Sequence, residues 1–265
     1  MPTPDPTSPL LEAVGAPGPE SGILDEVRAL LARGADATVR DASGSTAADL
    51  ARARGADRTA VLLDRADDPV QRPNAALLSA ADQGDADGVA LALRAGADVE
   101  ARDARRRTPL LLTVIGNHLG AAEVLVSRGA DPDAVDDQSD TPWLVTGVTG
   151  AMPMTRLLTS LDPDVTLRNR YGGVSIIPAS ERGHVDYVRW VTAHTDIDVN
   201  HVNDLGWTAL LEAVILGEGT APWQEIVRIL LDAGADPGIT DADGVSALAH
   251  ARARGFDEIA ALLAG

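Results

Sequence analysis

The feature that most constrains the fold of this chain is an internal duplication. When residues 8–64 are aligned with residues 208–264 at a constant shift of 200, 25 of 57 positions are identical without a gap. The pentapeptide ARARG at 51–55 recurs at 251–255. A chain that repeats itself in this way is built from similar units stacked in a row.

One complete unit is visible in the stretch TPLLLTVIGNHLGAAEVLVSRGADPDAVDD, which begins at Thr108. Thr108 is a good N-cap and Pro109 a good first helical residue, so a short helix is predicted from 109. Gly116 is expected to end this helix in the left-handed conformation. Apolar residues at helical spacing in 119–127 predict a second helix, closed by Gly129. The residues after it favour an extended, hairpin-like finger that leads to the next Thr-Pro.

The Thr slot of this unit recurs along the whole chain. It is occupied by Ser8, Thr46, Ala75, Thr108, Thr141, Val174, Thr208 and Ser246, with spacings of 38, 29, 33, 33, 33, 34 and 38. A period of 33 is that of the ankyrin repeat, and the chain resembles that family over essentially its whole length, in TPLLLTV, TPWLVTG, ERGHVDYV and the recurring GAD. The resemblance implies an all-α ankyrin-repeat solenoid of about eight helix-turn-helix repeats with short β-hairpin-like fingers.

The spacings also predict the organisation of the chain. The expected parts are a Pro-rich flexible N-terminus at 1–7, repeats 1–2 at 8–68, a Pro-containing break at 69–73 and repeats 3–8 at 74–265, ending in a polar-faced cap. ARARG is expected near the end of a first helix. The two spacings of 38 predict longer loops at 15–22 and 216–223. Whether the solenoid runs continuously through 65–73 stays open at this point.

Within the family, residues 169–264 are similar to a bacterial group in the stretches NRYGGVSIIPASERGH, DIDVNHVNDLGWTALLEAVILGEG and QEIVRILLDAGAD. Members of that group are generally known without an assigned reaction. The resemblance therefore implies binding and little more.

Charge and composition limit the classes of partner. Forty acidic residues against 22 basic ones give a net charge of -18, which repels nucleic acid and anionic membrane surfaces and favours basic partners. The absence of cysteine excludes disulfides, thiol catalysis and cysteine-ligated metal. The first residues do not form a signal-peptide pattern and no apolar run of 18 residues occurs, so a cytoplasmic location is expected. The oligomeric state cannot be predicted from the sequence.

The histidines are the natural place to look for chemistry. His118 and His184 follow the end of a first helix, where the ankyrin pattern commonly places histidine, so a structural role is expected. The stretch HTDIDVNH from His194 to His201 has Asp and Asn at the spacing of a calcium loop, but lacks the required Gly and the bidentate Glu. Since no catalytic motif is present either, we expect no catalytic residue, no metal site, no cofactor and no enzymatic activity.

Binding residues are expected at the finger tips, just before each Thr slot. Arginine, tyrosine and tryptophan are enriched at binding hot spots. Arg106 also occupies a slot where the repeat pattern prefers glycine. The predicted tip contacts are Arg105, Arg106, Arg107, Arg170, Tyr171 and Trp207. The competing interpretation is that these side chains are an ordinary solvated edge.

A second set of contacts is predicted on the first helices, beneath the fingers. The apolar residues expected on the concave face are Leu112, Ile115, Val145, Val148, Pro178 and Ile215. A register error of one residue would instead place them in the core. Trp143 occupies the Leu slot of the Thr-Pro-Leu pattern and should be buried. The predicted function is a non-catalytic protein–protein interaction module or scaffold, and the alternative is a small-molecule sensor or unusual enzyme that uses the concave groove.

Overall fold

The computed structural model describes residues 8–66, 68, 70 and 72–265. Its described residues form sixteen helices and no extended strand, and two isolated antiparallel bridges, Arg40 with Thr46 and Thr240 with Ser246, close the first and last fingers. The all-α solenoid of stacked repeats is therefore confirmed. The chain divides into two compact units. Unit 1 comprises the residues up to Ala104 together with Thr108–Asp131, and unit 2 comprises Arg105–Arg107 together with Pro132–Gly265.

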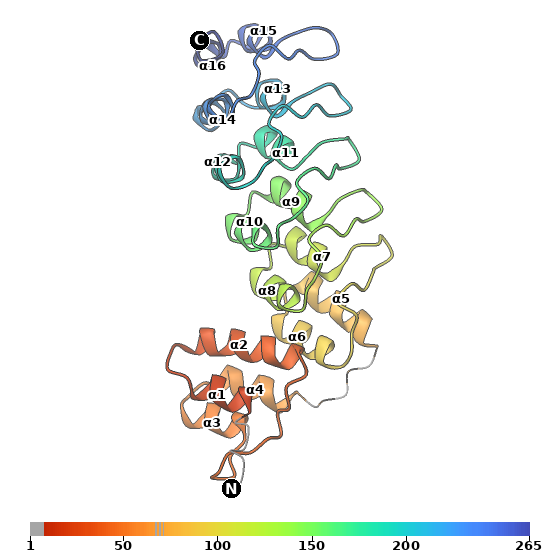
Figure 1. Cartoon of the computed structure of the whole chain (residues 1–265), viewed down its shortest axis with the longest axis vertical. Coiled ribbons are helices and arrows are strands. Elements are labelled where there is room, and N and C mark those ends of the chain that lie inside the picture. Colours follow the sequence, from red (N-terminus) through yellow and green to blue (C-terminus); the bar gives the residue numbers. More distant parts are fainter. Residues whose placement is uncertain (1–7, 67, 69, 71) are drawn as a thin grey trace. The chain divides into compact units, whose positions relative to one another are not determined.

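Each unit holds four pairs of antiparallel helices (Figure 1). The helices of unit 1 are α1 (Pro9–Gly15), α2 (Glu20–Ala32), α3 (Ala47–Ala53), α4 (Asp57–Asp64), α5 (Pro73–Gln83), α6 (Ala86–Arg94), α7 (Pro109–Ile115) and α8 (Leu119–Ser127). Those of unit 2 are α9 (Pro142–Thr149), α10 (Met152–Thr159), α11 (Ile176–Glu181), α12 (Val185–His194), α13 (Ala209–Ile215), α14 (Ala221–Asp232), α15 (Ala247–Ala253) and α16 (Asp257–Leu263).

The Thr slot caps the first helix of most repeats, as expected. The hydroxyls of Thr108, Thr141 and Thr208 accept the N–H three residues on at 3.1, 3.1 and 3.2 Å, and Thr46 and Ser246 do the same. Two of the slots were assigned wrongly. Ala75 lies inside α5, which starts at Pro73, and Val174 precedes Ser175, the N-cap of α11.

Of two further local expectations, one was wrong and the other was correct only in part. Gly116 has a φ of −82°, and Asn117 takes the left-handed turn instead, with a φ of 53°. Asparagine tolerates this conformation better than other side chains do. The extra residues of the two 38-residue spacings lengthen the loops only slightly, to 16–19 and 216–220 against 116–118 in the repeat of α7 and α8. Most of them extend the second helix, because α2 has 13 residues and α14 has 12, against nine in α8. Of the predicted break and N-terminus, residues 67, 69, 71 and 1–7 lie outside the described residues, so both stay predictions.

In unit 1, α2 packs on α6 and α8 as well as on its own neighbours α1 and α4. Leu91 of α6 belongs to the same apolar core as Leu10, Val27 and Leu31. The contact includes an ion pair, in which Arg28 Nε lies 2.6 Å from Asp87 Oδ1. The first helix pairs are therefore held to α6 and α8 by one shared core and by a half-buried ion pair.

The duplicated helices α2 and α14 pack with different faces. In α14, which contacts α12, Ile226 and Leu230 are fully buried. Their counterparts in α2 are Glu26, which is exposed, and Leu30, which is half-buried. Arg28 is instead covered in α2, with 12% of its side chain exposed against 52% for Arg228. The first copy thus has a glutamate at a position that is exposed there and holds a buried isoleucine in the second copy.

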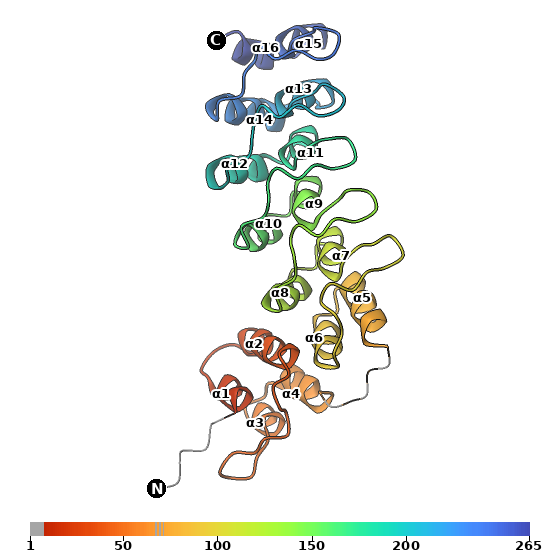
Figure 2. The same ribbon diagram turned by 45° about the vertical axis from the view of Figure 1, so that its right-hand side comes forward.

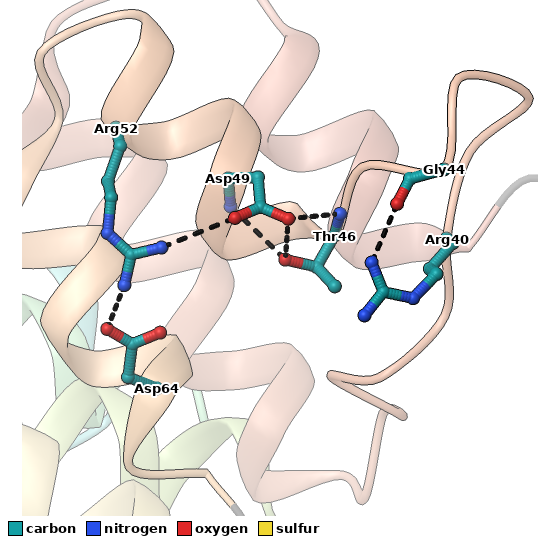
Figure 3. A network of polar contacts seen from close by, with 6 residues as sticks. All are labelled: Arg40, Gly44, Thr46, Asp49, Arg52 and Asp64. Atoms are coloured by element: carbon teal, nitrogen blue, oxygen red, sulfur yellow. Dashed lines mark hydrogen bonds and ion pairs between the residues drawn. The ribbon is translucent and has the colours of Figure 1, made fainter.

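A network of polar side chains holds the finger of the first duplicated pair against its helix (Figure 3). Thr46 and Asp49 form a capping box, with the Thr46 N–H donating to Asp49 at 3.0 Å. Arg52 bridges Asp49 and Asp64, and Arg40 donates to the Gly44 carbonyl at 2.7 Å. The second copy has Thr240, Ala249 and Ala264 at the positions of Arg40, Asp49 and Asp64, so it lacks this network.

The recurring ARARG has a structural role in both copies. It ends α3 and α15, as expected, and its last arginine donates to the C-terminal carbonyls of the preceding first helix. Arg254 Nη1 lies 2.8 Å from the Val214 oxygen, and Arg54 Nη1 bonds the Val14 and Ala16 oxygens. The last carbonyls of a helix have no hydrogen-bond partner within that helix. Each of these arginines therefore caps the C-terminal end of the first helix in the preceding repeat.

Other residue types make the same link between repeats. His118 Nε2 lies 3.2 Å from the Asp82 oxygen, His184 Nε2 lies 3.1 Å from the Val148 oxygen, and Trp223 Nε1 donates to the Glu181 oxygen at 3.0 Å. These bonds give hydrogen-bond partners to backbone carbonyls at the C-terminal ends of α5, α9 and α11. The structural interpretation of His118 and His184 is confirmed by their positions.

Replacing Arg254 by methionine is expected to lower the free energy of unfolding by about 1 kcal/mol, because the carbonyls at the end of α13 lose their donor. Arg252 lies on the exposed side of the same helix, which makes Arg252→Met the matched control. Urea unfolding of the two variants measures the difference. Equal unfolding midpoints for both variants would show that the cap contributes nothing.

The stretch GGVSIIPA, which departs from the Thr-Pro-Leu pattern, packs closely against α9. Gly147 of α9 lies against the backbone before α11, where a Cβ would be 1.9 Å from the Ser175 carbonyl oxygen. Beside it, the Thr146 hydroxyl and the Tyr187 hydroxyl are 3.0 Å apart, and the Tyr187 ring centre is 6.4 Å from that of Trp143. Trp143 is fully buried, as predicted, and burial raises the pKa of Tyr187 to about 12.

Candidate functional site

The fingers of unit 2 are organised by one side chain each. Near the start of each tip an Asp or Asn oxygen accepts the N–H groups two and four residues further on. This pattern is an Asx turn, which fixes a tight loop without a strand pair. The residues are Asp136, Asn169, Asn203 and Asp241, and they define the fingers 136–140, 169–173, 203–207 and 241–245.

Neighbouring fingers are joined tip to tip. The Asp137 N–H donates to the Arg105 carbonyl at 3.1 Å, and the Asp204 N–H donates to the Tyr171 carbonyl at 2.9 Å. Between them, Arg170 lies 3.6 Å from Asp140. Figure 2 shows the loops before α11, α13 and α15 projecting to the same side of unit 2. The segment 105–107 and the fingers 136–140, 169–173 and 203–207 thus form one continuous edge, which we name the finger edge.

The predicted tip residues all lie on the finger edge. Arg105 and Arg106 are exposed, and Arg107 and Trp207 are half-buried. Tyr171 is 50% exposed, and Leu205 in the next tip is 51% exposed. The edge therefore presents arginine and aromatic side chains together.

Two local features shape the centre of the finger edge. The Arg170 guanidinium carbon lies 4.6 Å from the Tyr171 ring centre, a cation–π contact that holds both side chains. Burial raises the pKa of Asp140, and Asp136 raises it further, against the opposing effect of Arg170. Arg106 has a φ of 59°, in the slot where the next finger has Ser139 at a φ of 60° and the two after it have Gly172 and Gly206.

The predicted apolar face on the first helices is only partly correct. Leu112 and Val145 are 3% and 7% exposed, so the expectation that they face solvent was wrong, and Pro178 is buried as well. These positions lie nine residues after the residue that organises each finger. In the later fingers, Glu212 and His250 occupy the same slot and bond Asn203 and Asp241.

In these two repeats the side chain nine residues after the Asn or Asp of the finger bonds to that finger. The position three residues further on is more exposed in several first helices. Ile115 is 48% exposed there and Val148 is 37% exposed, while Ile215 is half-buried. Ile115 belongs to unit 1 and Val148 to unit 2.

The remaining histidines have structural partners. His194 stacks on Trp190 with ring centres 3.7 Å apart, His201 Nε2 lies 2.6 Å from the Gly172 oxygen, and His250 Nε2 lies 2.7 Å from Asp241. In the calcium-like stretch, Asn200 accepts the Asp236 N–H at 2.7 Å and so links two repeats. Among the described residues, no group of three or more His, Asp or Glu side chains could hold a metal ion.

The sequence reasoning missed a buried carboxyl group. Glu212 is 6% exposed and accepts a hydrogen bond from Asn203 Nδ2 at 2.9 Å. Burial, reinforced by the charge of Glu181, raises its pKa to about 7, although Asn203 and Arg182 oppose the shift. Its counterpart Glu12 in the duplicate is exposed. The signal available in the sequence was a glutamate inside the apolar run ALLEAVI.

Two hollows of unit 2 bear on the small-molecule alternative. One is lined by Thr159, Asp162, Pro163, Val165, Ala193, His194, Thr195 and Asp196, and the other by Gly150, Met152, Gly183, His184, Val185, Asp186 and Tyr187. Neither is lined by a predicted tip residue. Over the described part of the chain, no helix is long and apolar enough to cross a membrane.

Comparison with known proteins agrees with this architecture. The family description "Ankyrin repeats (3 copies)" matches residues 149–241, and "Ankyrin repeat" matches residues 105–137. The ankyrin repeat protein YahD of Escherichia coli (strain K12) is 39% identical over 186 residues, which cover 70% of this chain and 92% of that protein.

Two crystal structures are similar as well. An ankyrin repeat domain from Acinetobacter baumannii AYE is 44% identical, with a TM-score of 0.68, over 71% of this chain and 95% of that one. The ankyrin repeat protein EF0377 is 38% identical, with a TM-score of 0.69, over 72% of this chain and 97% of that one. Ankyrin repeats are generally protein-interaction modules, typically without enzymatic activity. With this fold and these relatives, the chain belongs to the ankyrin-repeat family.

Proposed function

We propose that the protein is a non-catalytic recognition module that binds another protein through the finger edge of unit 2. The observation that carries the proposal is the joining of four successive tips into one edge that presents Arg105, Arg106, Arg170, Tyr171 and Trp207. Arginine and aromatic side chains provide most of the binding energy at protein interfaces. Arg107 and Val148, from the same unit, extend the proposed surface.

The slot of Arg106 is consistent with the proposal. Its backbone has a φ of 59°, and the same slot holds Ser139 at a φ of 60° in the next finger and Gly172 and Gly206 in the two after it. A left-handed backbone suits glycine best. Among these four tips, Arg106 is the one that offers a partner a long cationic side chain in this slot.

Charge reversal of Arg105, Arg106 and Arg107 is expected to weaken partner capture at least tenfold while the protein stays folded, because the three side chains lie at a tip outside the apolar core. The test compares proteins retained from a lysate of the source cell by the wild type, by the triple Glu variant and by a Trp207→Ala, Arg106→Glu variant. Arg228→Glu is the matched control, since Arg228 is 52% exposed on α14.

The proposal is supported if a protein is held by the wild type and the control but lost from both finger variants. It is contradicted if a retained protein binds the finger variants as well as the wild type. A small molecule that binds the folded wild type and both variants alike would instead favour the alternative function.

A further inference from the structure

Arginines of unit 2 gather at the finger edge. Acidic residues outnumber basic ones in this unit, as they do in the whole chain. A group of arginines nevertheless lies on two tips of the edge or directly beside them: Arg105, Arg106, Arg107, Arg168 and Arg170. Arg168 is the exposed residue just before the finger 169–173. The finger edge is therefore a local basic region on an acidic unit.

Two carboxylates of the finger 136–140, which follows 105–107 along the edge, are engaged within the protein. Asp136 is buried and accepts the N–H groups of Gln138 and Asp140 at 2.8 and 2.9 Å. Asp140 is half-buried and pairs with an arginine of the next tip. Asp137 is the exposed carboxylate of this finger. The exposed charges along this part of the edge are thus mostly positive.

These arginines can bind a carboxylate of a partner even where they already have a contact within the protein. A guanidinium carries five N–H donors in a planar fork that matches the two oxygens of a carboxylate. Arg170 shows that several contacts are compatible at one arginine. Its Nη1 lies 3.6 Å from Asp140 Oδ2, while its guanidinium carbon lies 4.6 Å from the Tyr171 ring centre.

Large apolar side chains follow the arginines along the edge. Tyr171 and Leu205 occupy the same slot of successive fingers, two residues after the Asn that organises each tip, and about half of each is exposed. The Asp204 N–H donates to the Tyr171 carbonyl at 2.9 Å, so the two tips lie against each other. Along the stack, the edge changes from arginine at 105–107 to apolar side chains at the last two tips.

We propose that the finger edge binds an extended segment of a partner protein in which acidic side chains are followed by large apolar ones. The acidic side chains contact the arginines of 105–107 and 168–170, and the apolar ones pack on Tyr171 and Leu205. Recognition of acidic motifs by clustered arginines is a recurring mode of peptide binding. The inference rests on the proposed function, because it specifies the chemistry of the partner for the same surface.

The net charge of the chain predicts the opposite preference. At -18, its long-range field attracts basic segments and repels acidic ones. A preference for an acidic segment therefore requires local contacts with the arginines. The sign of the charge on the bound segment distinguishes recognition at the finger edge from attraction by the whole protein.

The test uses fluorescein-labelled peptides in which a run of glutamates is joined to glycine-spaced Phe and Leu residues. Matched peptides have lysine in place of each glutamate, and both kinds are made with the charged run at either end, so that both chain directions are covered. Fluorescence anisotropy at near-physiological salt measures binding. The wild type is expected to bind a glutamate peptide about tenfold more tightly than its lysine match.

Three variants locate this preference on the edge. Triple replacement of Arg105, Arg106 and Arg107 by Glu should reverse the preference, so that the lysine peptides bind more tightly. Arg228→Glu on α14 changes the net charge at a distant exposed site and should keep the wild-type preference. Tyr171→Ala should weaken binding of the glutamate peptide about fivefold, because the apolar part loses its contact.

The inference is overturned if the wild type prefers the lysine peptides, binds both kinds equally or binds neither. It is also overturned if the triple variant, with an unchanged circular dichroism spectrum, still prefers glutamate. The proposed function is decided separately by a partner captured from the lysate. A photo-crosslink from position 171 to a partner segment without acidic residues would leave the finger edge as the binding surface and reject the acidic segment alone.

Discussion

Replacing Gly147 by alanine is expected to lower the free energy of unfolding by about 3 kcal/mol, the largest stability loss that we predict for a single methyl group in this chain. The added Cβ would lie 1.9 Å from the Ser175 carbonyl oxygen and 2.8 Å from its carbonyl carbon. Both contacts are with backbone, so no side-chain rotation relieves them. The helix α9 would have to move away from the segment that leads into α11.

Helix propensity alone predicts the opposite result for Gly147→Ala. Alanine is favoured over glycine in a helix by about 1 kcal/mol, so the variant would be stabilised if the contact with Ser175 were absent. Gly22 in α2 is the matched control, because no atom lies within 4 Å of a Cβ placed there. Chemical unfolding should show Gly147→Ala well below the wild type and Gly22→Ala at or above it. An unfolding midpoint of Gly147→Ala equal to that of the wild type would contradict this packing.

Replacing Glu212 by glutamine is expected to stabilise the protein by about 3 kcal/mol at about pH 8 and to have little effect at about pH 4. The pKa of Glu212 is raised in the folded state from 4.5 to about 7. The wild type therefore loses stability as pH rises across this window, because folding opposes ionisation of the buried carboxyl group. Glutamine has no proton to lose and still offers Asn203 an acceptor oxygen.

The measurement for Glu212→Gln is the difference in unfolding free energy from the wild type, taken at several pH values. Other carboxyl groups, such as Asp41 and Asp241, have lowered pKa values and change stability in the opposite sense at more acid pH. Their contribution cancels in the difference between the two proteins. A constant difference across the pH range would contradict the burial of an ionisable Glu212.

The local parts of this fold could be predicted from the sequence because their causes are local. Thr108 and Thr141 bond the N–H three residues on, and Pro109 suits the first turn, so the starts of α7 and α9 follow from a few neighbouring residues. The 33-residue period then repeats the unit. Val174 was placed one residue too early, since the N-cap of α11 is Ser175, which makes no side-chain capping bond. Ala75 was misplaced because the N-cap of α5 is Arg72, which has no hydroxyl to mark it.

The parts that could not be predicted depend on contacts between distant residues. Leu112 and Val145 are buried, whereas the spacing of apolar residues along a helix does not tell a buried position from one that lines an open groove. Glu212 resembles a surface residue in the sequence, and only the fold brings Asn203 within 2.9 Å of it. The packing of α2 on α6 and α8 likewise follows from the fold, because α2 and α14 share a duplicated sequence but bury different faces.

We expect a bound partner to lie on the finger edge, and site-specific photo-crosslinking tests this expectation most directly. A photoreactive phenylalanine analogue would replace Tyr171, which is 50% exposed on the edge, and in a second variant Arg228, which is 52% exposed on α14. With the partner retained by the wild type, crosslinks are expected from position 171 and not from position 228. Crosslinks from position 228 with none from position 171 would contradict the proposal that the finger edge is the binding surface.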